Sequence, residues 1–414
     1  MPNRIRVLDS TSKAMQRLGY LKLLCALVNE TETSNLTSLG RRLIEKVTKR
    51  VKIFSPFNTD IQNYVKVRLK DGAYKDIRQA VLNNTPNTQI TLEIQDLYLS
   101  DPTLPSSVGK LVGEDWRRYP YLGTSIELIK KGTYSALTRS LVLLSLTPKE
   151  ELAAFQSLDK QNNPMRLSDA QTLVFLYCFI DNDAEVLHPL FLSLINSSET
   201  SFNERYASSF LPSIFHQVIK TYQDRNINVE ERNRLTLLKK TGSKIEEWKG
   251  KPYSGGGAPQ EAIRVRLEPF CDLGFFKKPR FDHYEYQTTQ ALSILANRWD
   301  GVKNTEKFLQ EAYFETFARA KGLHISRADE SEAIEALVQA GDALKSSLGY
   351  TPITDVGLLA GIRLLTEKRL ILELGRTTEL LKQWQKNDPN FVRFTVDRMG
   401  NMAHVKFLKP RPET

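Results

Sequence analysis

The chain has 414 residues, of which 41% are hydrophobic and 26% charged, so its composition is that of a globular protein with several domains. Its longest apolar runs, Leu141–Leu146 and Leu173–Ile180, are far shorter than the roughly 20 residues that a membrane-spanning helix needs. The three cysteines are widely spaced and lie in apolar segments, which predicts reduced core thiols in a cytoplasmic protein without a disulfide or metal framework.

Positive charge gathers at the two ends of the chain. The net charge is +10; residues 1–80 hold 16 Lys and Arg against 7 Asp and Glu, and residues 351–414 hold 11 against 7. Concentrated positive charge favours a polyanionic partner, because neutralising phosphates releases their counterions. A solvated basic surface without a partner is the other interpretation, and charge alone does not separate the two.

The N-terminal segment predicts two helices followed by a strand. Apolar residues recur at helical spacing in Ser12–Val28 and again in Leu36–Val51, and Val65–Lys70 alternates apolar and basic residues as a half-buried strand does. The outer face of the second predicted helix is basic, with Arg41, Arg42, Lys46, Lys49 and Arg50. This arrangement is typical of a helix-turn-helix, and we expect these five side chains to contact DNA.

Two segments about 150 residues apart share one pattern: an apolar pair, two lysines, a short variable loop, a tyrosine, three residues, a threonine and an apolar helix. This order predicts a helix, a two-stranded hairpin and a second helix, with Thr138 or Thr288 as the N-cap of that second helix. Lysines at the base of such a hairpin lie naturally against phosphates; they are Lys130 and Lys131, and Lys277 and Lys278. Two unrelated junctions that match by chance are the alternative.

The C-terminal segment predicts two helices and a hairpin. The first helix spans Val356–Glu373 and ends at Gly375, and the second is capped by Thr377 or Thr378. A hairpin follows, with strands at 392–396 and 403–407. The expected DNA contacts are Lys382 and Lys386 on the second helix and Arg393, Arg398 and Lys406 on the hairpin. A hairpin that stabilises an oligomer is the competing interpretation.

Helix, tight turn, helix and hairpin is the order of a winged helix, and these segments resemble the winged helix-turn-helix DNA-binding superfamily. The resemblance covers about 35 residues at each repeated segment and carries no single family's fingerprint. It implies a mainly α fold with small β-hairpins (α+β), in which multiple winged-helix units are joined by helical segments. We expect domains at 1–107, 108–250, 260–348 and 351–414.

No motif in the sequence supports catalysis, and we expect neither a cofactor nor a metal. The five histidines lack metal-ligand spacing, and no phosphate-binding or nucleophile motif is present. Glu247-Trp248-Lys249, with Asp224 upstream, offers the Glu-x-Lys spacing of a metal-dependent nuclease, but no strand pattern surrounds it.

The sequence thus predicts a non-catalytic protein that reads or grips double-stranded DNA. The length favours a subunit of a larger prokaryotic machine, for example in anti-phage defence or a mobile element, over a simple regulator. Other protein subunits are then expected partners. A nuclease with an unrecognised site and a winged-helix scaffold for protein contacts remain the alternatives.

Overall fold

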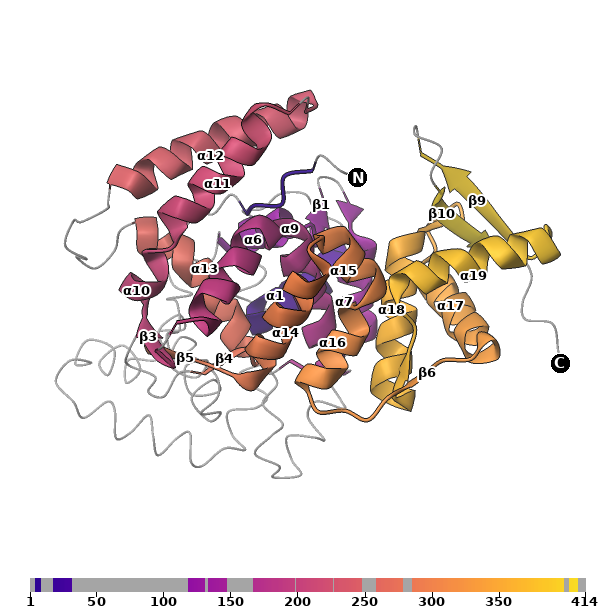
Figure 1. Ribbon diagram of the computed structural model, residues 1–414. Coiled ribbons are helices and arrows are strands. Elements are labelled where there is room, and N and C mark those ends of the chain that lie inside the picture. Colours follow the sequence, from indigo (N-terminus) through magenta and orange to yellow (C-terminus); the bar gives the residue numbers. More distant parts are fainter. Residues whose placement is uncertain are drawn as a thin grey trace, which may run out of the picture.

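The computed structural model describes residues 4–8, 18–31, 118–130, 133–146, 167–197, 199–225, 227–247, 258–277, 285–397 and 402–408. Within them the fold is mainly helical with four small sheets, which confirms the predicted α+β class. A larger helical body is joined to a smaller C-terminal body that carries α19 and a hairpin (Figure 1). None of the described helices is long and apolar enough to span a bilayer.

The larger body runs from the N-terminal helix to residue 320. Its elements are α1 (Leu18–Thr31), α6 (Arg118–Ser125), β1 (Ile129–Lys130), β2 (Thr133–Tyr134), α7 (Ala136–Leu143), α9 (Asp169–Ile195), β3 (Ser201–Asn203), α10 (Glu204–Ser208), α11 (Leu211–Gln223), α12 (Val229–Glu247), α13 (Ala258–Asp272), β4 (Phe276–Lys277), β5 (Glu285–Thr288), α14 (Gln290–Val302), α15 (Thr305–Glu311) and α16 (Tyr313–Ala320).

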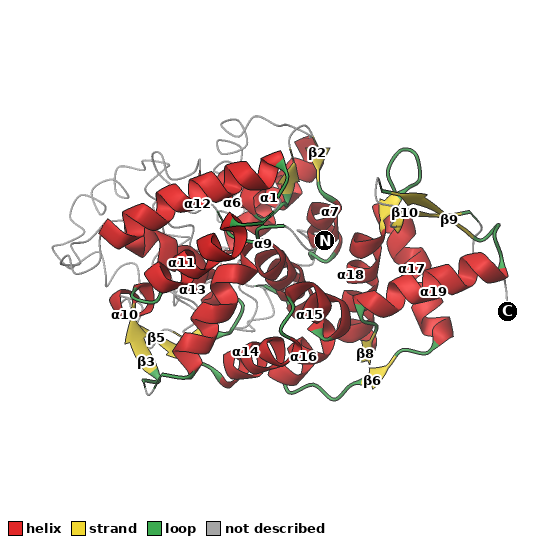
Figure 2. Cartoon of the chain, turned by 45° about the horizontal axis from the view of Figure 1, so that its top comes forward, coloured by secondary structure: helices red, strands yellow, loops and turns green. Residues whose placement is uncertain are grey.

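The smaller body follows. Its elements are β6 (Ser326–Arg327), α17 (Glu330–Leu344), β7 (Thr351–Pro352), α18 (Ile353–Arg363), the π-helical turn η4 (Leu364–Lys368), β8 (Leu370–Ile371), α19 (Leu374–Asn387), β9 (Val392–Val396) and β10 (Met402–Phe407). Figure 2 shows it beside the larger body, with α18 against that body and the hairpin β9–β10 at the far side.

Helix α9 lies at the centre of the larger core. Its N-terminus is fixed by a capping box, in which Ser168 and Gln171 satisfy each other's backbone N–H groups. The helix is interrupted at Asp183, whose φ of −135° and ψ of 19° are not helical. The Asp183 carboxylate is fully buried and pairs with the equally buried guanidinium of Arg266 on α13 at 2.7 Å. It also accepts the backbone N–H of Leu8 at 2.9 Å, so the N-terminal segment is tied to the same point.

The two repeated segments fold into matching junctions. In each, a helix ends at a residue with positive φ, Glu127 (61°) or Gly274 (85°), and a short antiparallel hairpin follows, β1–β2 or β4–β5. In both junctions, the residue just before the next helix donates its hydroxyl to the backbone carbonyl of the residue that follows the positive-φ position. These hydrogen bonds run from Ser135 to Leu128 at 2.9 Å and from Thr289 to Phe275 at 2.8 Å. The predicted order of helix, hairpin and helix is therefore confirmed at both places.

The predicted caps of these junctions are wrong. The N-caps are Ser135 for α7 and Thr289 for α14. Thr138 lies one turn inside α7, where its backbone N–H donates to Ser135, and Thr288 is the last residue of β5. The reason is the position of the cap: its hydroxyl accepts the N–H three residues later, so the cap is the first residue after the strand.

Two units of the chain share one topology. The central unit contains α9, β3, α10, α13, β4 and β5, with the hairpin of α11 and α12 between α10 and α13, and its antiparallel sheet has the order β3-β5-β4. The C-terminal unit, residues 330–408, contains α17, β7, α18, α19, β9 and β10, and its antiparallel sheet has the order β7-β10-β9. In each, the first strand follows the first helix and pairs with the last strand.

The described apolar side chains form two cores. The larger core fills the larger body and also includes Leu358, Ile362 and Leu374 of the C-terminal unit. The smaller core joins α17, α18, α19 and the hairpin. Helix α17 contributes to it although it precedes residue 351, where the last predicted domain begins. The four predicted domain boundaries stay predictions.

The predicted hairpin is confirmed as β9 and β10, but the helix bounds before it are wrong. Helix α18 ends at Arg363, and Arg369 rather than Gly375 adopts the left-handed conformation, with a φ of 61°. Helix α19 already begins at Leu374 with Glu373 as its N-cap, so Thr377 lies inside the helix. The π-helical turn η4 separates α18 from α19. Its C-cap is Arg369, so the chain leaves the helical path six residues before Gly375.

Candidate nucleic-acid interface

Four of the predicted DNA-binding residues lie in the C-terminal unit. Lys382 and Lys386 are exposed on α19, whose opposite face buries Leu380, Leu381 and Trp384 in the smaller core. Arg393 lies exposed on β9 and Lys406 lies half-buried on β10. The 3.6-residue period of α19 thus separates an apolar side from a basic side.

Arg393 and Lys406 stand directly opposite each other across the antiparallel hairpin. Residues in such a pair point to the same face of the sheet, and two like charges there repel each other. Lys406 is held by the Leu348 carbonyl at 3.1 Å and by the Tyr350 ring, 5.4 Å from its Nζ atom. These contacts orient the ammonium group without neutralising it.

Among the described residues, no carboxylate lies within ion-pair distance of Lys382, Lys386, Arg393 or Lys406. Other basic side chains of the same unit do have such partners. Arg376 pairs with Glu379 at 3.2 Å and Lys345 with Asp342 at 3.4 Å. The unit therefore presents four uncompensated positive charges on one helix and one hairpin.

His404 belongs to the same face of the hairpin and was not among the predicted contacts. It lies opposite Thr395, and its Nδ1 atom is 3.2 Å from the Thr395 hydroxyl oxygen. Strand alternation places His404 beside Lys406 and Thr395 beside Arg393, so the period of two was the signal that could have identified it. A bulge between Met402 and His404 adjusts the register at that end.

The N-terminal end of α19 is covered by the larger body. The Glu373 carboxylate accepts the backbone N–H groups of Phe314 at 3.2 Å and Glu315 at 2.9 Å, at the start of α16. Burial raises the pKa of Glu373 to about 7, although these two N–H groups oppose the shift. A Cβ atom added at Gly375 would lie 3.2 Å from the Gln310 carbonyl oxygen of α15, so glycine permits this close approach.

The other predicted contacts are distributed as follows. Lys277 is exposed at the end of β4, in the central unit. The backbone of Lys130 lies in β1, but its side chain is outside the description. Arg41, Arg42, Lys46, Lys49, Arg50, Lys131, Lys278 and Arg398 lie outside the described residues. Most of the predicted contacts whose side chains the structure describes therefore lie in the C-terminal unit.

The described residues contain neither a metal-binding cluster nor an exposed cysteine. They contain no group of three His, Cys, Asp or Glu side chains that could hold a metal ion. Glu247 is the last residue of α12 rather than part of a strand, and Asp224 follows the end of α11. Cys25, Cys178 and Cys271 are buried and free, as predicted. Burial raises the pKa of the Cys25 thiol to about 12.

Searches of protein-family models, of curated proteins and of solved structures gave no match to this chain.

Proposed function

We propose that the protein grips the backbone of double-stranded DNA with its C-terminal unit, acting as a winged helix. The order helix, strand, helix, helix, strand, strand supports this proposal, as does the sheet order β7-β10-β9. In this assignment α19 is the helix that faces DNA and the hairpin β9–β10 is the wing.

The observation that carries the proposal is the like-charged pair of Arg393 and Lys406 across the hairpin. Like-charged residues directly opposite each other destabilise a sheet, and an anion bound near them would relieve the repulsion. Phosphate groups of DNA supply such anions, and both Arg and Lys bind them. Lys382 and Lys386 add two exposed positive charges on α19.

Gripping the backbone is favoured over reading the bases. A recognition helix normally contacts base edges with its N-terminal residues. Here that end of α19 lies against α15 and α16, and its exposed side chains include Glu379, whose charge opposes phosphate. Arg376 in the N-terminal half pairs with Glu379 at 3.2 Å, whereas Lys382 and Lys386 lie in the C-terminal half without such a partner among the described residues. Lys and Arg contacts to phosphates position a protein without reading sequence.

The test is the salt dependence of binding to a fluorescently labelled DNA duplex, measured by anisotropy on the full chain. For Lys382→Ala with Lys386→Ala, we expect weaker binding and a slope of log K against log salt that is smaller by about 2, because each phosphate contact contributes about 0.9. Adding Arg393→Ala reduces the slope by about one more. Duplexes of different sequence should bind with affinities within about tenfold of each other, far below the ratio of a sequence reader.

The matched control is Lys239→Ala with Lys240→Ala, which removes two exposed lysines from α12. Figure 1 shows α12 at the opposite end of the molecule from α19. The control should keep the wild-type slope. If the triple variant of Lys382→Ala, Lys386→Ala and Arg393→Ala keeps it too, the C-terminal unit is not the interface.

The predicted N-terminal contacts form a separate arm of the experiment. If Arg41→Ala with Arg42→Ala reduces the slope, the predicted basic helix contributes to the grip. Cleavage of the duplex that needs a divalent metal ion and is lost in Glu247→Ala would instead support the nuclease alternative.

A further inference from the structure

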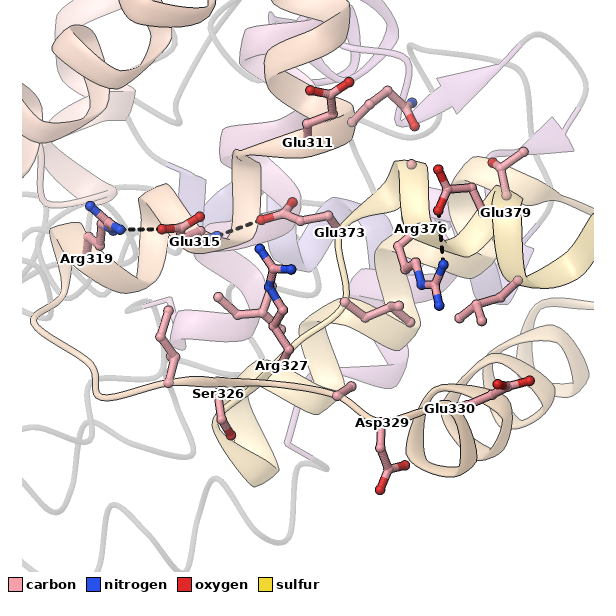
Figure 3. Close-up of a pocket in the computed structure, with 18 residues that line it drawn as sticks. Glu311, Glu315, Arg319, Ser326, Arg327, Asp329, Glu330, Glu373, Arg376 and Glu379 are labelled. Carbon is pink, nitrogen blue, oxygen red and sulfur yellow. Dashed lines mark hydrogen bonds and ion pairs between the residues drawn. The ribbon is translucent and has the colours of Figure 1, made fainter. Parts of the chain in front are cut away.

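A cleft of 820 Å³ lies at the junction of the larger body and the C-terminal unit. Its walls come from α15 and α16 on one side and from the segment 325–330, residues 371–373 and the first half of α19 on the other. This volume is within the range of about 300–1,000 Å³ found for clefts that hold ligands. Figure 3 shows Arg327 pointing into its middle, toward Glu315 and Glu373.

Strand β6 forms one wall of the cleft and has an unpaired edge. It pairs with β8 in parallel, and this pairing uses the N–H groups of Ser326 and Ala328, which donate to Arg369 at 3.2 Å and Ile371 at 3.1 Å. Because backbone groups alternate along a strand, the N–H of Arg327 points to the other edge. Among the described residues it has no hydrogen-bond acceptor. An open strand edge is a template for a further strand.

The charge of the cleft is opposite in sign to that of the whole chain. Its walls carry three arginines, Arg319, Arg327 and Arg376, against six carboxylates, Glu311, Glu315, Asp329, Glu330, Glu373 and Glu379. The formal net charge of the lining residues is thus −3 with Glu373 ionised and −2 with Glu373 protonated, in a chain of net charge +10. Lys307 and Arg298, just outside the lining, pair with Glu311 and Glu315. DNA phosphates are repelled by this surface, whereas a segment rich in Lys or Arg is attracted to it.

The floor of the cleft gives such a segment apolar contacts. Ile325, Ala328 and Ile371, which are half-buried, line the cleft together with the buried Leu372 and Leu380. An extended peptide directs alternate side chains to opposite faces. It can therefore set apolar side chains on this floor and basic side chains toward the carboxylates, while its main chain pairs with β6.

We propose that an extended, basic segment of a partner protein docks in this cleft and adds a strand to the free edge of β6. The main-chain pairing supplies affinity and the carboxylates select the charge of the segment, as in other cases of strand addition. This docking site is independent of the DNA-binding surface, because its residues are not among the four positive side chains proposed to grip DNA.

The probe is a fluorescently labelled synthetic peptide of alternating lysine and valine, titrated with the full chain at low salt. We expect this peptide to bind and a glutamate–valine peptide not to bind. A lysine–valine peptide N-methylated on every residue has no N–H donor on either edge, so we expect it to bind about tenfold more weakly for each hydrogen bond lost. Equal binding of the lysine and glutamate peptides, or no loss on N-methylation, overturns the proposal.

The matched variants are Arg327→Pro and Arg327→Ala. Proline removes the outward N–H and leaves the Ser326 and Ala328 donors to β8 in place, so it is tolerated at such an edge. We expect about tenfold weaker peptide binding for Arg327→Pro. Arg327→Ala keeps the N–H, removes a positive charge, and should bind the lysine–valine peptide at least as tightly as wild type. Equal affinities of the two variants contradict strand addition.

The N-methylated peptide tests the same pairing on the unaltered chain, so misfolding of a variant cannot decide the result. Both Arg327 variants should bind duplex DNA as wild type does. Lys382→Ala with Lys386→Ala and Arg393→Ala should weaken DNA binding and leave peptide binding unchanged, so a failure of one proposal is distinguishable from a failure of the other.

Discussion

Apart from the α11–α12 hairpin inserted in the central unit, the central and C-terminal units have the same order of helices and strands. They differ in the exposure of the third of these shared helices, the one before the last two strands. In the central unit that helix is α13, in which every residue from Val265 to Cys271 is buried. In the C-terminal unit it is α19, which buries one face and exposes the other. Topology alone therefore does not decide which unit can meet a partner; the surroundings of the third helix do.

Two charged side chains of α13 are buried, whereas the lysines of α19 are exposed. Arg266 and Glu268 on α13 point inward, where Arg266 meets Asp183 and Glu268 accepts the hydroxyl of Tyr286 at 2.6 Å. Lys382 and Lys386 on α19 point to solvent. Polar side chains thus hold the central unit together, whereas those of the C-terminal unit remain available to a polyanion.

The largest expected effect comes from breaking the buried pair in the central unit. Arg266→Met leaves the Asp183 carboxylate buried without its cation, so we expect a loss of about 3–5 kcal/mol in the free energy of unfolding. Chemical denaturation measures it. The double variant Arg266→Met with Asp183→Asn removes both charges and should recover part of the loss. A single-variant loss below about 1 kcal/mol would show that α13 does not depend on this pair.

The contact between the C-terminal unit and the larger body gives the next largest effect. A Cβ atom at Gly361 of α18 would lie 2.5 Å from the Phe314 ring and 2.9 Å from the Leu372 carbonyl oxygen. We expect Gly361→Ala to cost about 1–3 kcal/mol through overpacking. Gly301→Ala is the control, because no atom lies within 4 Å of its added Cβ. Equal stabilities of the two variants in thermal unfolding would show that the bodies pack loosely.

Glu373 makes the stability of this junction dependent on pH. Burial raises its pKa to about 7 in the folded protein, against an ordinary value near 4.5. The folded state therefore binds more protons than the unfolded state between these values, and its stability falls as pH rises through this window. The glutamine in Glu373→Gln cannot ionise. The free energy of unfolding of this variant relative to wild type should therefore increase by on the order of 2 kcal/mol as pH rises from about 4.5 to about 7.

Comparing the free energies of unfolding of Glu373→Gln and wild type across this range isolates the effect, since burial also raises the pKa of Asp183 to about 6. Glu379→Gln removes an exposed carboxylate of the same helix and is the matched control. A constant difference between Glu373→Gln and wild type would mean that Glu373 does not titrate in this window.

Local patterns in the sequence predicted elements well but not their surroundings. The strand alternation of residues 392–407 predicted the hairpin, and the repeated lysine pattern predicted both junctions. These elements are predictable because they are defined by hydrogen bonds between residues close in the sequence. The burial of Arg266 was not predictable, since its partner Asp183 is 83 residues away. Nor was the cleft around Arg327, because its walls come from segments that only the tertiary fold brings together.

Of the predicted site, the basic residues of α19 and the hairpin came from periodicity, which identifies the outer face of an element. By the same patterns, Lys277 beside a hairpin and Lys382 on a helix were both predicted to contact DNA. It did not reveal that the N-terminal end of α19 is covered, because that depends on the contact between Glu373 and α16.

The smallest expected effect sharpens the comparison between the two units. Lys277 is a single exposed lysine at the end of β4, next to a third helix that is buried. The proposal places DNA on the C-terminal unit, so Lys277→Ala should change the affinity for duplex DNA by less than about twofold and leave the salt slope unchanged. If Lys277→Ala instead lowers the slope by about one, Lys277 contacts a phosphate, and the central unit shares the grip despite its buried helix.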